Sequence, residues 1–408
     1  MVVEPGAALL PAERRAVAAL AAIYATRLFG LFLLLPVLAL HAGSLPGGTP
    51  LLAGLAVGAY GLAQALMQIP FGAWSDRLGR RPLIVAGLLL HVGGSALGYF
   101  AGTAWSLIAA RVVQGLGAVS GPVMALLADL TRVASRTRAM AFIGVSIGAS
   151  FMLSLVGGPL LAGVIGVPGI FAVIGALGLV ALVLVQFALP DESPRPAARG
   201  RRRSFRQAVT RRLLPFYLGI FVLHLSLTAV FIAVPHALRD VHGMAAPDHW
   251  QSYLAVFAAS LVLTVPMVLW SERVDRPERA ELATGLLLVL AQVALALVYR
   301  DFLPMAGALV LYFAAFNFLE ARWPAALAEA AGDETRGAAL GVFSTCQFAG
   351  AFSGGLLGGV LLGSPLSIAG VFLLGGLAAG SWLTVAGWSE SRRNRAIDGV
   401  PGRGRRLQ

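Results

Sequence analysis

The sequence predicts an all-α membrane protein whose twelve transmembrane helices form two six-helix halves related by a pseudo-two-fold axis. Three observations predict this fold class. The 408-residue chain is 58% hydrophobic and only 12% charged. A soluble protein of this size could not bury so much apolar surface. Twelve apolar runs each reach the roughly 20 residues that cross a bilayer. The arginines are confined to alternate loops, as in a polytopic membrane protein.

The first half, residues 1–189, contains six of these runs. The first of them begins at residue 16 after a short polar segment and is not followed by a small-residue cleavage site, so we interpret it as a retained span and not a signal peptide. Pro, Gly or charged residues separate each run from the next. The predicted spans of this half are 16–40, 51–74, 82–101, 104–128, 138–163 and 167–189.

A polar segment, 190–212, then divides the chain. Its prolines and clustered arginines oppose a compact fold, so we predict a cytoplasmic linker. The second half, 213–390, contains six further apolar runs, and 391–408 form a basic cytoplasmic tail that is too short to fold. The predicted spans of the second half are 213–238, 251–271, 280–299, 303–326, 337–362 and 366–388.

A weak internal repeat supports the division. The loop after the second span reads Trp-Ser-Asp-Arg-Leu-Gly-Arg over 74–80, and the loop after the eighth reads Trp-Ser-Glu-Arg-Val-Asp-Arg over 270–276. Four of the seven positions are identical, although any charged loop of this kind gives some similarity by chance. Parallel six-span repeats with a substrate site at their interface are a known transporter plan.

The arginines predict the orientation. All 31 basic residues other than histidine are Arg, and the net charge is +12. With the N-terminus inside, inside segments hold 26 arginines and outside segments hold two, Arg239 and Arg300. The positive-inside rule then places both termini in the cytoplasm of a multi-pass protein of the bacterial inner (plasma) membrane. The same distribution explains the basic charge without nucleic acid as a partner.

The loop between the second and third spans carries the most specific motif. It resembles the signature Gly-x-x-x-Asp-Arg-x-Gly-Arg-Arg of the major facilitator superfamily. We expect Arg80 to reach Asp129 at the inner end of span four, so that the pair holds one arrangement of the bundle, as a conformational switch requires. An ordinary solvated loop is the alternative. The motif residues are Gly72, Asp76, Arg77, Gly79, Arg80 and Arg81.

Two further elements resemble those of the superfamily. In span four, Arg111 and the following Gln114 belong to an Arg-x-x-x-Gly-x-Gly element, which implies a role in proton movement, although a structural arginine bonded to backbone carbonyls remains possible. Span five resembles the Gly-Pro-x-x-Gly-Gly element of proton-coupled antiporters, with Ala162 in place of one Gly. A merely Gly-rich helix is the alternative. The matching residues are Gly157, Gly158, Pro159 and Gly163.

Longer stretches, from about residue 20 to 388, look like the YajR-type drug/proton antiporters within this superfamily. The stretches are 27–38, 68–72, 140–146 and 315–320. The resemblance implies the major facilitator fold and export of a drug-like solute. That type carries a small soluble domain after the last span, and we expect that domain to be absent here.

Glu320 is the only carboxylate well inside a predicted span. Because burial disfavours the charged form of a carboxyl group, Glu320 is our first candidate for binding the coupling proton. Asn317 lies on the same helical face and could donate a hydrogen bond to it. Alternatively, Glu320 forms a fixed ion pair, for instance with Arg27. We expect Arg322 to extend toward the inner surface.

His224 in span seven is a second candidate for carrying protons, although a lone histidine in a helix is more often a packing residue. Several polar and aromatic residues could line a mostly apolar cavity, with simple packing as the alternative. These cavity candidates are Arg27, Tyr60, Gln64, Gln68, Gln114, Tyr312, Phe313, Phe316 and Asn317.

The sequence therefore predicts a monomeric secondary transporter that exports a small, hydrophobic or drug-like solute by alternating access in exchange for protons. The alternative is a proton-coupled uptake symporter or facilitator for a metabolite, either an organic anion or a sugar-like solute. The sequence shows no paired catalytic residues and no metal-ligand spacing, so we expect no enzymatic activity, no cofactor and no metal. The expected partners are the solute, protons and the lipid bilayer.

Overall fold

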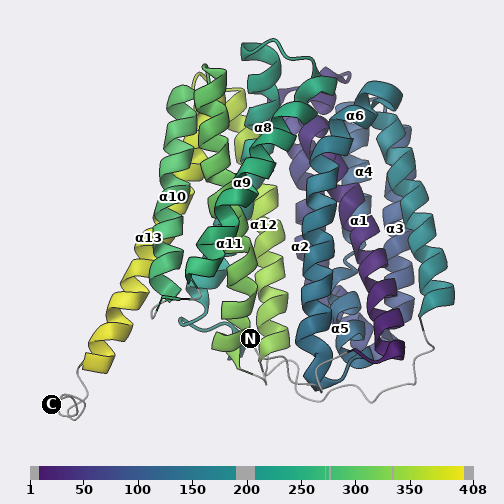
Figure 1. Ribbon diagram of the computed structural model, residues 1–408. Coiled ribbons are helices and arrows are strands. Elements are labelled where there is room, and N and C mark those ends of the chain that lie inside the picture. Colours follow the sequence, from purple (N-terminus) through teal and green to yellow (C-terminus); the bar gives the residue numbers. More distant parts are fainter. Residues whose placement is uncertain (1–8, 190–206, 272, 275–276, 333–334, 399–408) are drawn as a thin grey trace.

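The structure is a computed structural model that describes residues 9–189, 207–271, 273–274, 277–332 and 335–398. Its first half is built from helices that run up and down the bundle in turn (Figure 1). These helices are α1 (Pro11–Ser44), α2 (Pro50–Leu78), α3 (Arg80–Tyr99), α4 (Ala104–Leu116), α5 (Ser120–Leu130) and α6 (Val133–Ala188).

The second half repeats this plan. Two short segments, the π-helical η2 and the 3₁₀-helical η3, extend and follow its first long helix. Its elements are α8 (Leu214–His236), η2 (Ala237–Val241), η3 (Ala246–Asp248), α9 (His249–Ser271), α10 (Pro277–Val298), α11 (Phe302–Ala331), α12 (Arg336–Leu362) and α13 (Ser367–Asp398).

Eleven helical segments of the described chain are long and apolar enough to cross a bilayer. One of them, α6, has 56 residues and would extend about 84 Å, whereas the hydrocarbon core is about 30 Å thick. The backbone leaves the helical conformation at Gly166, where φ is 69° and ψ is 170°. Gly166 thus separates spans five and six, and the predicted fold of twelve spans is confirmed.

Two elements differ from the prediction. Span four is broken into α4 and α5, because Gly117 has a non-helical ψ of 67° and Ala118 and Val119 form only short local turns. Helix α13 continues to Asp398, beyond the predicted end of span twelve at residue 388. Most of the predicted linker (190–206), the end of the tail (399–408) and repeat positions 272, 275 and 276 lie outside the described residues.

Local sequence explains several helix ends. The Thr49 hydroxyl accepts the backbone N–H of Leu52 at 3.1 Å, and Pro50 follows at the first helical position of α2, where its missing N–H costs nothing. Thr103 and Ser106 form a reciprocal capping box at the start of α4. Gly79 has a φ of 98°, which glycine adopts without strain, and it alone separates α2 from α3.

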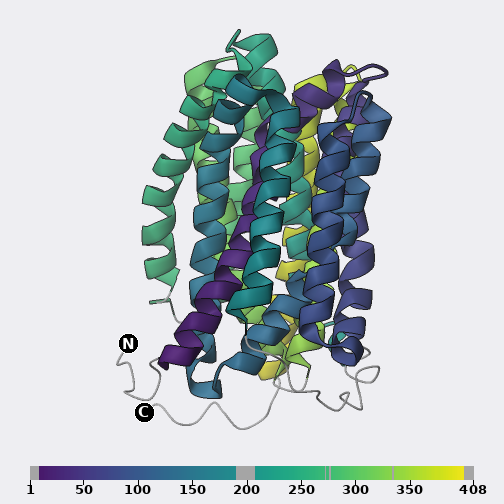
Figure 2. The same ribbon diagram turned by 90° about the vertical axis from the view of Figure 1, so that its right-hand side faces the viewer.

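The start of α1 and the end of α13 lie at the same end of the bundle (Figures 1 and 2), which we call the terminal end; the other is the distal end. Helix α2 descends from the distal end and packs along α12 of the other half. Near the distal end the backbones touch, because a Cβ atom on Gly54 or Gly58 would collide with α12, and one on Gly355 would collide with α2. We call this contact the glycine seam.

A second contact between the two six-helix halves is made by aromatic residues, which we call the aromatic cluster. Phe151 of α6 lies among the buried residues of the second half. Its ring centroid is 5.5 Å from that of Phe257 on α9 and 6.2 Å from that of Phe231 on α8. Phe32 of α1 packs edge-on against the same ring at 5.0 Å. The glycine seam and this cluster together join the two halves near the distal end.

Candidate functional site

The loop with the family-like motif lies at the terminal end. Arg80, in the first turn of α3, forms an ion pair with Asp76 in the last turn of α2, and its Nη1 donates to the Ser75 hydroxyl at 2.9 Å. Its Nε lies 3.5 Å from Asp129 Oδ2, in the last turn of α5. The structure thus brings together the two residues that the sequence predicted as a switch pair.

The remaining motif residues support this junction. Arg81 Nη2 donates to the Gln186 carbonyl at 2.6 Å, which attaches the start of α3 to the end of α6. Gly72 lies against Gly121 of α5, and Arg77 is exposed. All these contacts are within the first half, so the motif joins the ends of four helices there.

A buried polar cluster surrounds Arg27 in the middle of the first half. Arg27 is 1% exposed, and its Nη2 donates to the Tyr60 hydroxyl at 2.7 Å and to Gln64 Oε1 at 2.9 Å. The same nitrogen also donates to the Gly117 carbonyl at 2.8 Å. Because the break between α4 and α5 removes this carbonyl from the helical hydrogen-bond pattern, the carbonyl can accept a hydrogen bond from Arg27. Gln64 in turn donates to Gln68 Oε1 at 3.4 Å.

Arg111 of α4 joins this cluster from the other side of Tyr60. Its guanidinium carbon lies 4.8 Å from the Tyr60 ring centroid, a cation–π distance, and its Nη1 donates to Gln114 Oε1 at 2.8 Å. Gln114 donates to the Ser95 hydroxyl of α3 at 2.9 Å. Among the described residues, Arg111 is therefore held by a side-chain amide and a ring, and not by backbone carbonyls.

The two buried guanidiniums lack an acidic partner among the described residues. Arg27 and Arg111 contact only amides, a phenol, an aromatic ring and one carbonyl. Arg27 Nε and Nη1 and Arg111 Nε have no hydrogen-bond partner there. The fixed pair of Arg27 with Glu320, which the sequence left open, is not formed. The first half therefore presents positive charge without its own counter-charge.

The second half presents the complementary group. The Glu320 side chain of α11 is 34% exposed, although the helix around it is largely buried. Gln347 of α12 donates through Nε2 to Glu320 Oε1 at 3.2 Å, and the same amide nitrogen lies 2.8 Å from His224 Nε2 on α8. His224 Nδ1 lies 3.8 Å from Glu320 Oε2, which has no hydrogen-bond partner in the described chain. Phe316 packs beside the His224 ring at 5.9 Å.

Other predicted site residues lie elsewhere. Asn317 donates to the Ser260 hydroxyl at 3.4 Å and not to Glu320, so that expected contact was wrong. Tyr312 and Phe313 point into the core of the second half, where Tyr312 accepts from Ser226 at 3.1 Å. Arg322 pairs with Glu281 of α10 at 3.2 Å instead of extending alone to the surface.

The antiporter-like element of α6 serves close packing. Gly158 lies against the backbone of Leu33 on α1, and Gly157 against the Leu33 side chain. Gly163 lies against Pro247, in η3 of the second half near the distal end. Pro159 remains within a continuous helix. Larger side chains at these glycines would separate α6 from α1 or from the other half.

Sequence reasoning missed Gln347 and the Gly117 carbonyl. Gln347 was detectable as the single amide side chain within an apolar and Gly-rich span. The Gly117 carbonyl gave no comparable signal, because only the helix break makes it available. The described residues hold no cluster of three or more His, Cys, Asp or Glu that could bind a metal ion.

Known proteins resemble this chain over most of its length. Inner membrane transport protein YajR of Escherichia coli (strain K12) is 38% identical over 382 residues, which cover 93% of this chain and 84% of that protein. Multidrug resistance protein MdtH of Cronobacter sakazakii (strain ATCC BAA-894) is 29% identical over 273 residues, 64% of this chain and 65% of MdtH. These relatives confirm the resemblance drawn from the motifs.

Solved structures show the same fold at low identity. The D-xylose-proton symporter superposes with a TM-score of 0.74 at 16% identity, covering 91% of this chain and 96% of that one. A bacterial homologue of the human lysosomal transporter Spinster, in an inward-facing and occupied conformation, gives 0.71 at 14% identity, covering 96% and 98%. The family model described as Major Facilitator Superfamily matches residues 20–320. From the fold, the motifs and these matches, the chain belongs to the major facilitator superfamily and is a multi-pass membrane transporter.

Proposed function

We propose that this transporter exports a small, hydrophobic or drug-like solute in exchange for protons, by alternating access of one central site. The name of one relative, a multidrug resistance protein, supports export. The glycines of α6 that resemble an antiporter element agree with it; they pack that helix against α1 and against Pro247 of the second half.

The observation that carries the proposal is the position of Glu320. It is a partly exposed carboxyl group in the middle of a membrane helix, and its Oε2 lacks a hydrogen-bond partner in the described chain. An intramembrane carboxyl group is costly and marks an ion or proton path. A bound proton removes the charge, and Gln347 still has its amide to donate to Oε1.

Protonation of Glu320 then provides the coupling step. With the carboxylate charged, the two halves carry opposite charges, and we propose that Glu320 and the two guanidiniums attract one another when the halves approach. With the carboxyl group neutral, that attraction is lost, and the equilibrium between the two arrangements of the halves shifts. Inward proton movement supplies about 2.3 kcal/mol per 100 mV for each charge.

We further propose that the terminal end faces the cytoplasm of a bacterial inner membrane, as the arginine distribution requires. Residues 1–189 and 213–390 are then the two moving halves, joined by the segment 190–212. With the glycine seam and the aromatic cluster on the periplasmic side, we propose that this arrangement is the inward-facing state. A reporter fused after Gln408 that is active only in the cytoplasm tests the orientation, and activity of a periplasmic reporter there would contradict it.

The switch pair of Arg80 and Asp129 is proposed to stabilise one of these arrangements. It binds the ends of α3 and α5 at the cytoplasmic surface, where the second half must approach when the cytoplasmic side closes. Loss of this ion pair is expected to change the relative positions of the ends of α3 and α5, and therefore the surface that meets the second half.

The coupling role is tested in proteoliposomes with an imposed pH gradient. Glu320→Gln is expected to abolish solute movement driven by the gradient, while a downhill solute gradient still drives exchange. Glu329→Gln is the matched control, because Glu329 is an exposed carboxylate on the same helix. Gradient-driven transport by Glu320→Gln at the rate of the unmodified protein would refute the assignment.

A second candidate is uptake or facilitated movement of an organic anion. Arg27 and Arg111 favour it, because both are buried without an acidic partner in the described residues. Accumulation of radiolabelled organic anions in right-side-out vesicles, but not in everted ones, would support this candidate against export.

A further inference from the structure

At the terminal end a groove of about 420 Å³ lies between the start of α1 and the ends of α5 and α6. None of its lining residues belongs to the central site or to the switch pair, and the proposed function does not use it. The groove is lined by Ala12, Glu13, Arg15, Ala16, Leu130, Phe187, Ala188 and Leu189.

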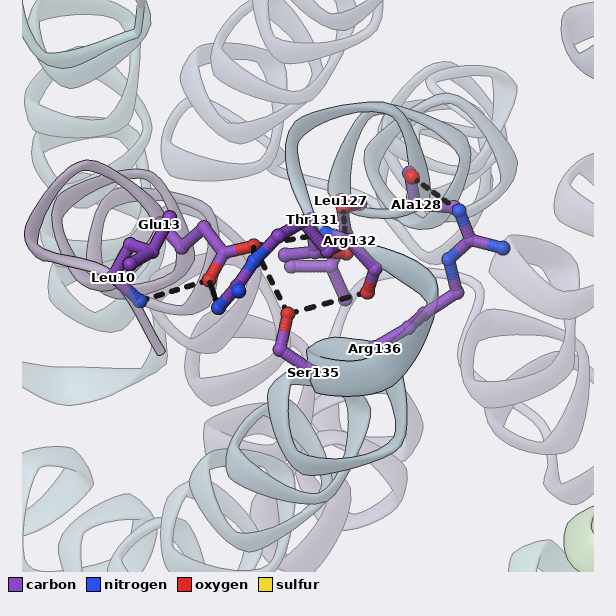
Figure 3. A network of polar contacts seen from close by, with 8 residues as sticks. All are labelled: Leu10, Glu13, Leu127, Ala128, Thr131, Arg132, Ser135 and Arg136. Atoms are coloured by element: carbon purple, nitrogen blue, oxygen red, sulfur yellow. Dashed lines mark hydrogen bonds and ion pairs between the residues drawn. The ribbon is translucent and has the colours of Figure 1, made fainter. Parts of the chain in front are cut away.

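One wall of the groove is a fixed polar network (Figure 3). Glu13 Oε1 accepts from the backbone N–H and Nε of Arg132 at 2.9 and 3.0 Å, and from the Ser135 hydroxyl at 3.0 Å. Its Oε2 accepts from Arg132 Nη2 at 3.0 Å and from the Leu10 N–H at 2.8 Å. Glu13 is 6% exposed, so its charge is compensated inside the protein and does not repel an anion in the groove.

A second wall carries an available cation. Arg15 is exposed and forms no hydrogen bond or ion pair with any side chain or backbone group in the described part of the chain. It stands in the second turn of α1, close to the N-terminal end of that helix. The groove therefore attracts negative charge at its polar rim.

The opposite wall is apolar and faces outward from the bundle. Phe187 is 83% exposed, whereas Leu130 is half-buried and Leu189 is only 5% exposed, so Phe187 supplies the open apolar surface of this wall. A free anion would leave this surface uncovered. A ligand that satisfies both walls must carry an anionic head and an apolar chain, and the groove lies where the first apolar helix begins and the sixth span ends.

We propose that this groove binds one acidic phospholipid of the leaflet at the terminal end, with the phosphate at Arg15 and an acyl chain along Phe187. Both walls belong to the first half, so the bound lipid bridges α1 and the end of α6 and moves with that half during transport. The lipid stabilises the half and is not part of the transport path.

The test is native mass spectrometry of the full chain, released from detergent with phosphatidylglycerol or with phosphatidylcholine of the same acyl chains. One phosphatidylglycerol is expected to be retained in preference to phosphatidylcholine. Arg15→Gln is expected to weaken this retention about fivefold, the typical contribution of one basic residue near a lipid surface. Arg14→Gln is the matched control, because Arg14 is exposed on the same turn but does not line the groove.

A second variant tests the contribution of the apolar wall to lipid binding without changing any charge. Ala12→Trp keeps every charge and fills the groove, so it is expected to remove the preference for phosphatidylglycerol while the melting temperature without added lipid is retained. Equal losses in Arg14→Gln and Arg15→Gln would overturn the proposal, as would equal retention of both lipids. The proposal would also be overturned if inorganic phosphate raised the melting temperature as much as phosphatidylglycerol does. It would likewise be overturned if the chain formed a dimer through this groove that Ala12→Trp abolishes.

Discussion

At the residue scale, the arginines and the carboxylate of the central site are divided between the halves by sign. Arg27 and Arg111 belong to the first half, and Glu320 belongs to the second. A pair formed within one half would be satisfied in every state of the transporter. Charges placed on opposite halves interact only through the interface, so their attraction depends on how the halves meet. In the proposed mechanism, this division is what would allow a proton on Glu320 to affect the conformation.

Gln347 is expected to hold the side chains of Glu320 and His224 in fixed positions relative to each other. Gln347→Leu removes a donor to a charged group, a loss of about 2 kcal/mol that corresponds to a roughly thirtyfold slower rate of pH-driven transport. Thr345→Val is the control, since in the described part of the chain the Thr345 hydroxyl donates only to the Gly341 carbonyl of its own helix. Initial rates in proteoliposomes measure both. A rate within twofold of the unmodified protein for Gln347→Leu would show that the amide is not needed.

Glu13 is expected to be a stability residue. Glu13→Gln removes the carboxylate that accepts from Arg132, Ser135 and Leu10, so the start of α1 loses its attachment to the link between α5 and α6. The melting temperature in detergent should fall, and transport by the remaining folded protein should be unchanged. A melting temperature equal to that of the unmodified protein would contradict this expectation.

Several of these residues could be identified from the sequence because membrane spans hold few polar groups. Glu320, His224, Arg27 and Arg111 stood out for this reason. Their partners were harder to predict, because side-chain direction depends on helix rotation and packing. Asn317 shares a helical face with Glu320 in spacing, yet it turns to Ser260 of α9.

At the element scale, the glycines decide how closely helices approach. In the glycine seam, α2 and α12 meet backbone to backbone, which side chains larger than hydrogen would prevent. The sequence indicated close packing through its 49 glycines, but not which helices would use them. The same limit applies to the break between α4 and α5. At the break, Gly117 lies against the backbone of Gly87, and its carbonyl accepts a hydrogen bond from Arg27.

Gly58→Leu is expected to prevent closure of the distal end. Its side chain would occupy the space of the Phe352 and Gly355 backbone, and relief of such overpacking costs about 1–3 kcal/mol. Transport should fall about tenfold. Gly93→Leu on α3 is the control, because nothing lies within 4 Å of a Cβ there. Full activity of Gly58→Leu would mean that the seam does not form during the cycle.

At the scale of the whole molecule, the twelve spans and their grouping could be predicted because hydropathy and arginine placement are dominant in a membrane. The arrangement of the two halves could not be predicted. It is set by the glycine seam and by the insertion of Phe151 into the second half, and neither has a signature in residue spacing.

A disulfide across the interface is expected to arrest transport. In Pro50→Cys/Gly363→Cys, with Cys346→Ser as background, the new Cβ at 363 lies 3.4 Å from the Cβ at 50, close to disulfide geometry. Oxidation should stop transport and a reductant should restore it. The control is Val92→Cys/Gly178→Cys, a pair 3.9 Å apart within the first half. Continued transport by the oxidised Pro50→Cys/Gly363→Cys protein would exclude opening of the distal end.

The single-residue turn at Gly166 has a consequence for biosynthesis. No charged residue stands between Arg138 and Asp191, so the ribosome delivers spans five and six as one uninterrupted apolar stretch. Nothing in this stretch tells the insertion machinery which way to thread either helix. The arginines on its two flanks supply that information, and they hold both flanks on the same side of the membrane. The two helices should therefore enter the bilayer together as a hairpin, with Gly166 as its tip.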